Sequence, residues 1–180
     1  VVCGEAAERV HDLDAGLLYD TIVHTRDWFW SDPERHRIGR ADLVAASGSI
    51  VRTSLLELGF DLPDMAVDVA TRYRRIRDES IALFPETIQC LEDLNSAGIG
   101  LEMITNGTGP GQRRKIERFE LERYFDHVLI EGEIGFGKPE PAVYETAMAA
   151  LGSEPMETWC VGDNLEWEVA AHSASVFTRC

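Results

Sequence analysis

Two polar clusters in this 180-residue chain combine residue types that bind phosphoryl oxygens. Thr105-Asn106-Gly107 follows an apolar run, and its hydroxyl and backbone N–H groups are suited to hold an anion at a turn. Gly135–Pro141 places Lys138 between two glycines and two prolines, which restrict its backbone. A restricted lysine suits an ammonium group that must meet a concentrated negative charge. Both clusters also fit ordinary turn and helix-entry chemistry.

A third cluster contains metal-binding residue types. Gly162-Asp163-Asn164 follows the apolar stretch 159–161, and Glu168 lies five residues beyond Asp163. One acid at the end of a strand and a second on the next helical turn are able to bind Mg²⁺ directly and through water. The alternative is that Asp163 only caps a helix.

The pattern around these clusters predicts strands that alternate with helices. We expect strands at 99–104, 127–130 and 159–161, and helices at 86–98, 112–119, 142–151 and from about 166. This alternation is typical of right-handed βαβ units and a parallel sheet. Ligands bind at the carboxyl ends of such strands, which is where all three clusters fall.

The first part of the chain lacks this alternation and is predicted to be helical. Apolar residues recur every three or four positions from Leu13, and Ser31-Asp32-Pro33 ends the first stripe. Asp42 and Asp64 begin two further helices. The predicted division is therefore a helical segment at 1–82 and an α/β core at 83–180.

Composition excludes several classes of function. Thirty-two acidic and 17 basic residues give a net charge of −15, which disfavours binding to nucleic acids. No apolar run approaches the roughly 18 residues of a membrane span, so we expect a soluble protein without membrane contact. The four cysteines are scattered, as in a reducing compartment, which predicts a cytoplasmic location.

Taken together in this order and spacing, the three clusters resemble motifs II, III and IV of the haloacid dehalogenase (HAD) superfamily, in its phosphatase-like branch. The resemblance implies a Rossmann-like parallel sheet with an N-terminal helical cap. It implies that Thr105, Asn106 and Lys138 act on the phosphoryl group. It also implies that Asp163 and Glu168 bind Mg²⁺, and that the substrate is a small phosphorylated metabolite.

The resemblance further implies an attacking aspartate and a second aspartate two residues later, at the end of a first strand. The sequence offers only Asp12 and Asp14 for this pair. The charged residues before Asp12 do not suit a buried strand, and Gly16 stands where the family has Thr or Val. The helical stripe from Leu13, with Asp12 as its N-cap, is the favoured interpretation. It predicts a truncated chain that lacks the nucleophile strand.

Three functional alternatives remain open. The intact parent is expected to hydrolyse phosphomonoesters, whereas the dehalogenase branch attacks carbon without metal. The chain itself is also interpreted as a non-catalytic fragment or binding module. A separate cluster, Trp28-Phe29-Trp30 with Arg35, His36, Arg37 and Arg40, is either aromatic packing with paired arginines or a surface that selects an anionic substrate.

Overall fold

The computed structural model describes residues 1–162 of the chain. The chain divides into two compact units, Val1–Ala82 and Leu83–Cys180, and each is described by itself. None of the helices within residues 1–162 has the length and apolar character needed to cross a lipid bilayer.

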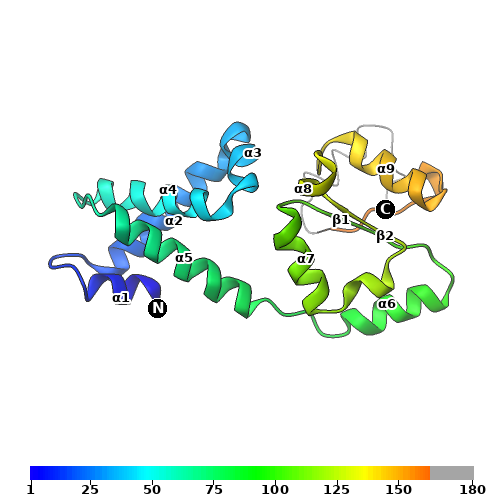
Figure 1. The fold of residues 1–180 in the computed structure, drawn as a ribbon, viewed down its shortest axis with the longest axis horizontal. Helices are drawn as coiled ribbons and strands as arrows, with labels where there is room; N and C mark the ends of the chain where they lie inside the picture. The colour runs from blue at the N-terminus through cyan, green and yellow to red at the C-terminus, as the bar shows by residue number, and fades with distance from the viewer. Residues whose placement is uncertain (163–180) are drawn as a thin grey trace. The chain divides into compact units, whose positions relative to one another are not determined.

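The first unit is helical. Helix α4 (Leu43–Glu57) packs against both α2 (Ala15–Ser31) and α5 (Pro63–Ser80), as Figure 1 shows. The shorter helices α1 (Val2–Ala7) and α3 (Pro33–Ala41) flank them. The predicted helical character of this segment, and the helix end at Ser31-Asp32-Pro33, are confirmed.

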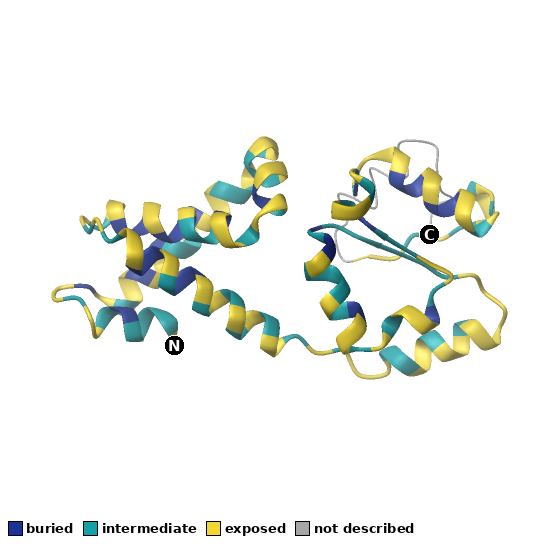
Figure 2. Ribbon diagram, in the orientation of Figure 1, coloured by how far each residue is buried: buried dark blue, intermediate teal, exposed yellow. Residues whose placement is uncertain are grey.

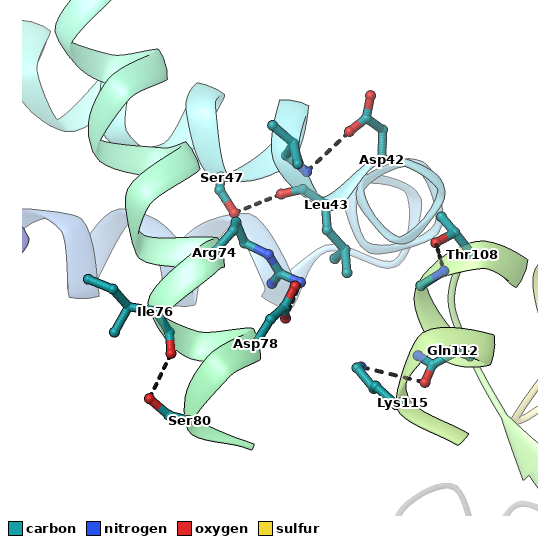
Figure 3. Close-up of polar contacts among 12 residues, drawn as sticks. Asp42, Leu43, Ser47, Arg74, Ile76, Asp78, Ser80, Thr108, Gln112 and Lys115 are labelled. Atoms are coloured by element: carbon teal, nitrogen blue, oxygen red, sulfur yellow. Dashed lines mark hydrogen bonds and ion pairs between the residues drawn. The ribbon is translucent and has the colours of Figure 1, made fainter. Parts of the chain in front are cut away.

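Aspartate side chains fix the start of several of these helices. Asp42 Oδ1 accepts hydrogen bonds from the N–H groups of Val44 and Ala45, at 3.1 and 2.9 Å. Figure 3 draws one of them. Asp14 Oδ1 accepts from the N–H of Leu17 at 2.7 Å and is the N-cap of α2. The prediction that Asp12 caps this helix is wrong. Asp12 lies before the cap in a left-handed conformation with φ 65°, so Asp14 is the residue whose extended backbone suits the capping position.

The core of the first unit lies between α2, α4 and α5, where the buried positions in Figure 2 face inward. Leu18 and Leu55 are fully enclosed there. A buried hydroxyl pair, Ser54 Oγ to Thr25 Oγ1 at 3.1 Å, joins α4 to α2, and Ser54 Oγ also binds the Ile50 carbonyl oxygen at 2.9 Å, so its polar atom is satisfied. The helix α1 is held to α5 by an ion pair between Glu5 and Arg72.

Up to residue 162, the second unit contains two strands and several helices. Its elements are α6 (Thr87–Ser96), β1 (Glu102–Thr105), α7 (Gly109–Arg118), η1 (Leu121–Tyr124), β2 (His127–Ile130), α8 (Glu131–Ile134), α9 (Pro141–Leu151) and η2 (Pro155–Glu157). The strands are parallel, and their register pairs Glu102 with His127 and Thr105 with Ile130. The predicted parallel pairing of these two strands is confirmed.

Helix α9 packs against both strands and builds the core of this unit. Tyr144 and Val143 of α9 are fully buried, and Ile104 of β1 and Leu129 of β2 pack against them. Figure 1 shows α9 on one side of the strands and α6 on the other. The residues of β1 are half-buried, and Ile130 at the end of β2 is fully buried.

Other predicted elements differ from the structure. Residues 159–161 do not form a strand, because no other strand pairs with them among the described residues, and Trp159 and Val161 are largely exposed. Helix α7 begins three residues earlier than position 112 because Thr108 caps it. The helix predicted from about 166 lies outside the described residues.

Candidate phosphate-binding site

The site begins where β1 ends. Thr105 is the last residue of β1, and Asn106 and Gly107 form the turn that leads to α7. Thr108 closes this turn as the N-cap of α7, its Oγ1 accepting a hydrogen bond from the Gly111 N–H at 3.3 Å (Figure 3). The turn therefore presents the end of a strand and the start of a helix in immediate succession, an arrangement that favours anion binding.

The side chain of Asn106 joins this turn to the loop that carries Lys138. Asn106 Nδ2 donates to the carbonyl oxygen of Lys138 at 2.6 Å, and the Lys138 N–H donates to Asn106 Oδ1 at 2.8 Å. We call this pair of hydrogen bonds the amide clasp. Because it holds both backbone polar groups of Lys138, the clasp fixes the Lys138 backbone next to Asn106, which directly follows Thr105.

Glu131 supports the same turn and was not predicted. Its Oε2 accepts a hydrogen bond from the Gly107 N–H at 2.9 Å, and the next residue, Gly132, donates its N–H to the Gly107 carbonyl oxygen at 2.9 Å. The backbones approach so closely here that a Cβ on Gly132 would lie 2.7 Å from the Gly109 nitrogen. An acid that follows a buried strand at Ile130 was the available signal in the sequence.

Gln112 fixes the turn from the α7 side. Its Nε2 donates to the Asn106 carbonyl oxygen at 2.8 Å, while its Oε1 lies 3.5 Å from Lys115 Nζ (Figure 3). Gln112 was not among the predicted site residues. Its observed role is to hold the backbone of Asn106.

Ion pairs around the turn neutralise the nearby acids of α8 and η1. Arg113 of α7 binds Glu133 through two hydrogen bonds, at 2.9 and 2.7 Å, and reaches Glu122 at 3.0 Å. Hydrogen bonding to Arg113 holds the pKa of Glu133 below its ordinary value. Glu133 therefore stays ionised and paired, which limits its repulsion of an anion at the turn.

The predicted site residues fall into two groups. Asn106 and Lys138 are in direct contact, and Thr105 precedes Asn106 on β1. Asp163 and Glu168 lie outside the described residues. Within residues 1–162, no three His, Cys, Asp or Glu side chains are grouped as a metal site.

The candidate nucleophile pair lies in the first unit and not on a strand. Asp12 is exposed in the loop between α1 and α2 and pairs with His11 at 2.7 Å, and Asp14 caps α2. A capping carboxylate is already occupied by the backbone N–H of its helix.

The aromatic and basic cluster of the first unit is a packing arrangement in large part. The guanidinium of Arg35 lies 3.9 Å from the ring centroid of Trp28 and donates to the carbonyl oxygens of Trp28 and Phe29. Arg37 is paired with Glu34 through two hydrogen bonds. A Cβ on Gly39 would lie 2.8 Å from the Phe29 ring, so this glycine lets α3 approach the aromatic residues.

Comparison with known proteins gives a consistent result. The family described as haloacid dehalogenase-like hydrolases matches residues 5–175. A phosphoserine phosphatase from Thermus thermophilus is 34% identical over 140 residues, which is 78% of this chain and 51% of that protein. A ribulose-1,5-bisphosphate 5-phosphatase from Halopiger xanaduensis is 33% identical, over 66% of this chain and 50% of that protein. The chain thus spans about half the length of these curated relatives.

A solved structure shares the fold. The HAD-hydrolase YfnB from Bacillus subtilis, determined with bound magnesium, superposes with a TM-score of 0.67 at 16% identity. The superposition covers 89% of this chain and 68% of YfnB. At this identity the similarity concerns the fold alone.

Proposed function

Because the chain belongs to the haloacid dehalogenase-like hydrolase family, we propose that it carries the phosphate-binding half of a Mg²⁺-dependent phosphomonoesterase. Thr105 donates its hydroxyl to a phosphoryl oxygen, and the Lys138 ammonium balances the negative charge of the phosphoryl group. The amide clasp is the observation that carries this proposal, because it brings the lysine loop to the end of β1.

The proposed substrate is a small phosphorylated metabolite. The similar proteins include phosphatases named for phosphoserine and for ribulose-1,5-bisphosphate, which are compounds of this kind. The net charge of −15 favours a small substrate over a polyanion, since a nucleic acid would be repelled over a large area. A single ammonium beside a hydroxyl matches one phosphate group.

Asp163 and Glu168 are the residues proposed to hold Mg²⁺. Their carboxylate oxygens are the donor type that Mg²⁺ takes in proteins, so the side chains fit the ion chemically. When bound, the ion would stabilise negative charge on the phosphoryl oxygens. Dependence on Mg²⁺ also separates this proposal from the dehalogenase alternative, which remains an untested prediction.

The attacking carboxylate is proposed to be neither Asp12 nor Asp14. Support comes from the loop position of Asp12 and from the engagement of Asp14 at the start of α2. Under this proposal residues 1–82 act as the cap and residues 83–180 as the core, and the chain binds phosphate without turning it over. Robust hydrolysis of a phosphomonoester by the chain, abolished in Asp12→Asn, would refute this part.

Calorimetric titration of the whole chain with inorganic phosphate and Mg²⁺ tests the binding proposal. Lys138→Ala removes a charged hydrogen-bond donor, which is worth about 1.5–3 kcal/mol, or roughly 10- to 100-fold in affinity. Thr105→Val should weaken binding by a smaller factor. Arg114→Ala, an exposed charge-matched change on α7, should leave it unchanged. Equal affinities in the Lys138 and Arg114 variants would rule the site out.

A further inference from the structure

Asn106 uses its amide oxygen and one of its two amide N–H groups on the backbone of another residue. An amide side chain has one oxygen acceptor and two N–H donors. The acceptor Oδ1 is used by the Lys138 N–H at 2.8 Å, and Nδ2 binds the Lys138 carbonyl oxygen at 2.6 Å. An ionised phosphate oxygen accepts hydrogen bonds but cannot donate them. Asn106 Oδ1, which is also an acceptor, therefore cannot form a hydrogen bond with it.

The surroundings of Asn106 hold its amide in one orientation. Gln112 Nε2 binds the Asn106 carbonyl oxygen at 2.8 Å, and Glu131 Oε2 binds the adjacent Gly107 N–H at 2.9 Å. Gly137 leaves the space that the clasp needs, because a Cβ there would lie 2.5 Å from Asn106 Oδ1. Side chains from α7 and α8 thus hold the backbone that carries the Asn106 amide.

We infer that Asn106 is a positioning residue, which acts on the bound phosphate through Lys138. This inference rests on the proposed function and refines it, since Lys138 is the group proposed to meet the phosphate. The clasp sets where the Lys138 backbone lies, and the side chain then reaches the phosphate from a fixed origin. Fixing a donor in advance strengthens its interaction because less ordering is needed on binding.

The inference predicts that the effect of Asn106 depends on Lys138. Asn106→Ala removes both hydrogen bonds and should weaken phosphate binding by about 5- to 10-fold, as expected for one or two neutral hydrogen bonds acting indirectly. In a Lys138→Ala background the same change should have an effect of less than about twofold. A direct phosphate contact would give the same loss in both backgrounds.

Asn106→Asp separates the two halves of the clasp. It keeps an oxygen that accepts from the Lys138 N–H, but it places a second oxygen against the Lys138 carbonyl. We expect the Lys138 amide to remain protected from hydrogen exchange in Asn106→Asp and to exchange at least tenfold faster in Asn106→Ala. Unchanged exchange in the alanine variant would overturn the clasp, whatever the result with phosphate.

The Nζ resonance of Lys138 reports directly on whether Asn106 positions this lysine. If Asn106 only stabilised the fold, its replacement would not change the response of this resonance to phosphate. The chain has only two lysines, Lys115 and Lys138, so their Nζ resonances are assigned with one Lys115→Arg variant. The Lys138 resonance should shift on addition of inorganic phosphate in the wild type and shift less in Asn106→Ala. The melting temperature of each variant is measured in parallel to show that it is folded.

The outcomes separate the inference from the proposed function. If the wild-type Lys138 resonance does not shift on addition of inorganic phosphate, the proposed function is wrong and the inference is wrong with it. If it responds equally in wild type and Asn106→Ala, the phosphate site stands and the positioning role is wrong. A reduced response in an Asn106→Ala variant that remains folded supports both.

Discussion

Glu102 and His127 occupy directly paired positions of the two parallel strands, and their side chains meet at 3.2 Å between Glu102 Oε2 and His127 Nδ1. The carboxylate is the buried member, with 5% of its side chain exposed against 51% for His127. Neither Glu102 oxygen has a well-formed hydrogen bond. Burial raises the pKa of Glu102, His127 opposes the rise, and the charge of Asp126 adds to it.

This pair predicts how stability changes with pH. Because the folded-state pKa of Glu102 lies above its ordinary value of 4.5, the folded protein binds this proton more tightly than the unfolded chain does. The stability that this group contributes is therefore complete below that value and is lost as the pH rises through the raised pKa. At pH values above the raised pKa of Glu102, Glu102→Gln should make the chain more stable. It should also make the stability depend less on pH.

Urea unfolding at about pH 5 and about pH 8 measures the difference. Glu117→Gln is the matched control, because Glu117 is exposed on α7 and should leave the pH dependence unchanged. Stability that rises with pH in the wild type but not in Glu102→Gln would contradict the assignment.

The aromatic cluster offers a pair of arginines with opposite expectations. Arg35→Ala removes the contact with Trp28 and two backbone hydrogen bonds, so it should destabilise the first unit by about 1–2 kcal/mol. Arg37→Ala breaks only an exposed ion pair with Glu34 and should change stability little. Chemical denaturation of both variants checks this order, and equal losses would show that Arg35 is not a packing residue.

Two glycines should respond to alanine with opposite signs. Gly132→Ala places a Cβ 2.7 Å from the Gly109 nitrogen and 2.8 Å from the Gly107 oxygen. Because these are backbone atoms, the turn itself must move, at a cost of about 1–3 kcal/mol and with weaker phosphate binding. Gly48→Ala lies within α4 with no atom within 4 Å of the new Cβ, and should stabilise the chain by about 0.5–1 kcal/mol. Thermal melting compares the two, and a stabilised Gly132→Ala would refute the close approach.

The start of α2 gives a further test of which aspartate caps the helix. Asp14→Ala removes the acceptor for the Leu17 N–H and should destabilise the chain by about 1 kcal/mol. Asp12→Gly should be neutral or stabilising, since glycine adopts a φ of 65° without strain. Helical circular dichroism during urea titration distinguishes them. The reverse order would restore Asp12 as the cap.

Local patterns predicted the elements whose signals are complete within a few residues. The apolar spacing after Leu13 and the proline at 33 located α2, and the run His127–Ile130 located β2 within the same bounds. Asp42 was recognised as a cap because capping chemistry is local. The choice between Asp12 and Asp14 was not local, because both lie before the same stripe and only the backbone angles separate them.

These local patterns did not predict contacts between segments that lie far apart in the sequence. Lys138 and Thr105 were selected by residue type and position, but nothing in the spacing indicated that the Asn106 amide would bind the lysine backbone. Glu131 and Gln112 were missed for the same reason, since each acts on a residue in another segment. The apolar run 159–161 predicted a strand, but a strand also requires a partner, and pairing is a tertiary property.

The amide clasp fastens two positions that lie 32 residues apart, and the ring of chain that it closes contains α7, β2 and α8. Opening such a ring releases the enclosed segment to a larger set of conformations, so the clasp and the order of that segment are linked in free energy. An anion that draws Lys138 into place would therefore make the local opening of β2 less favourable.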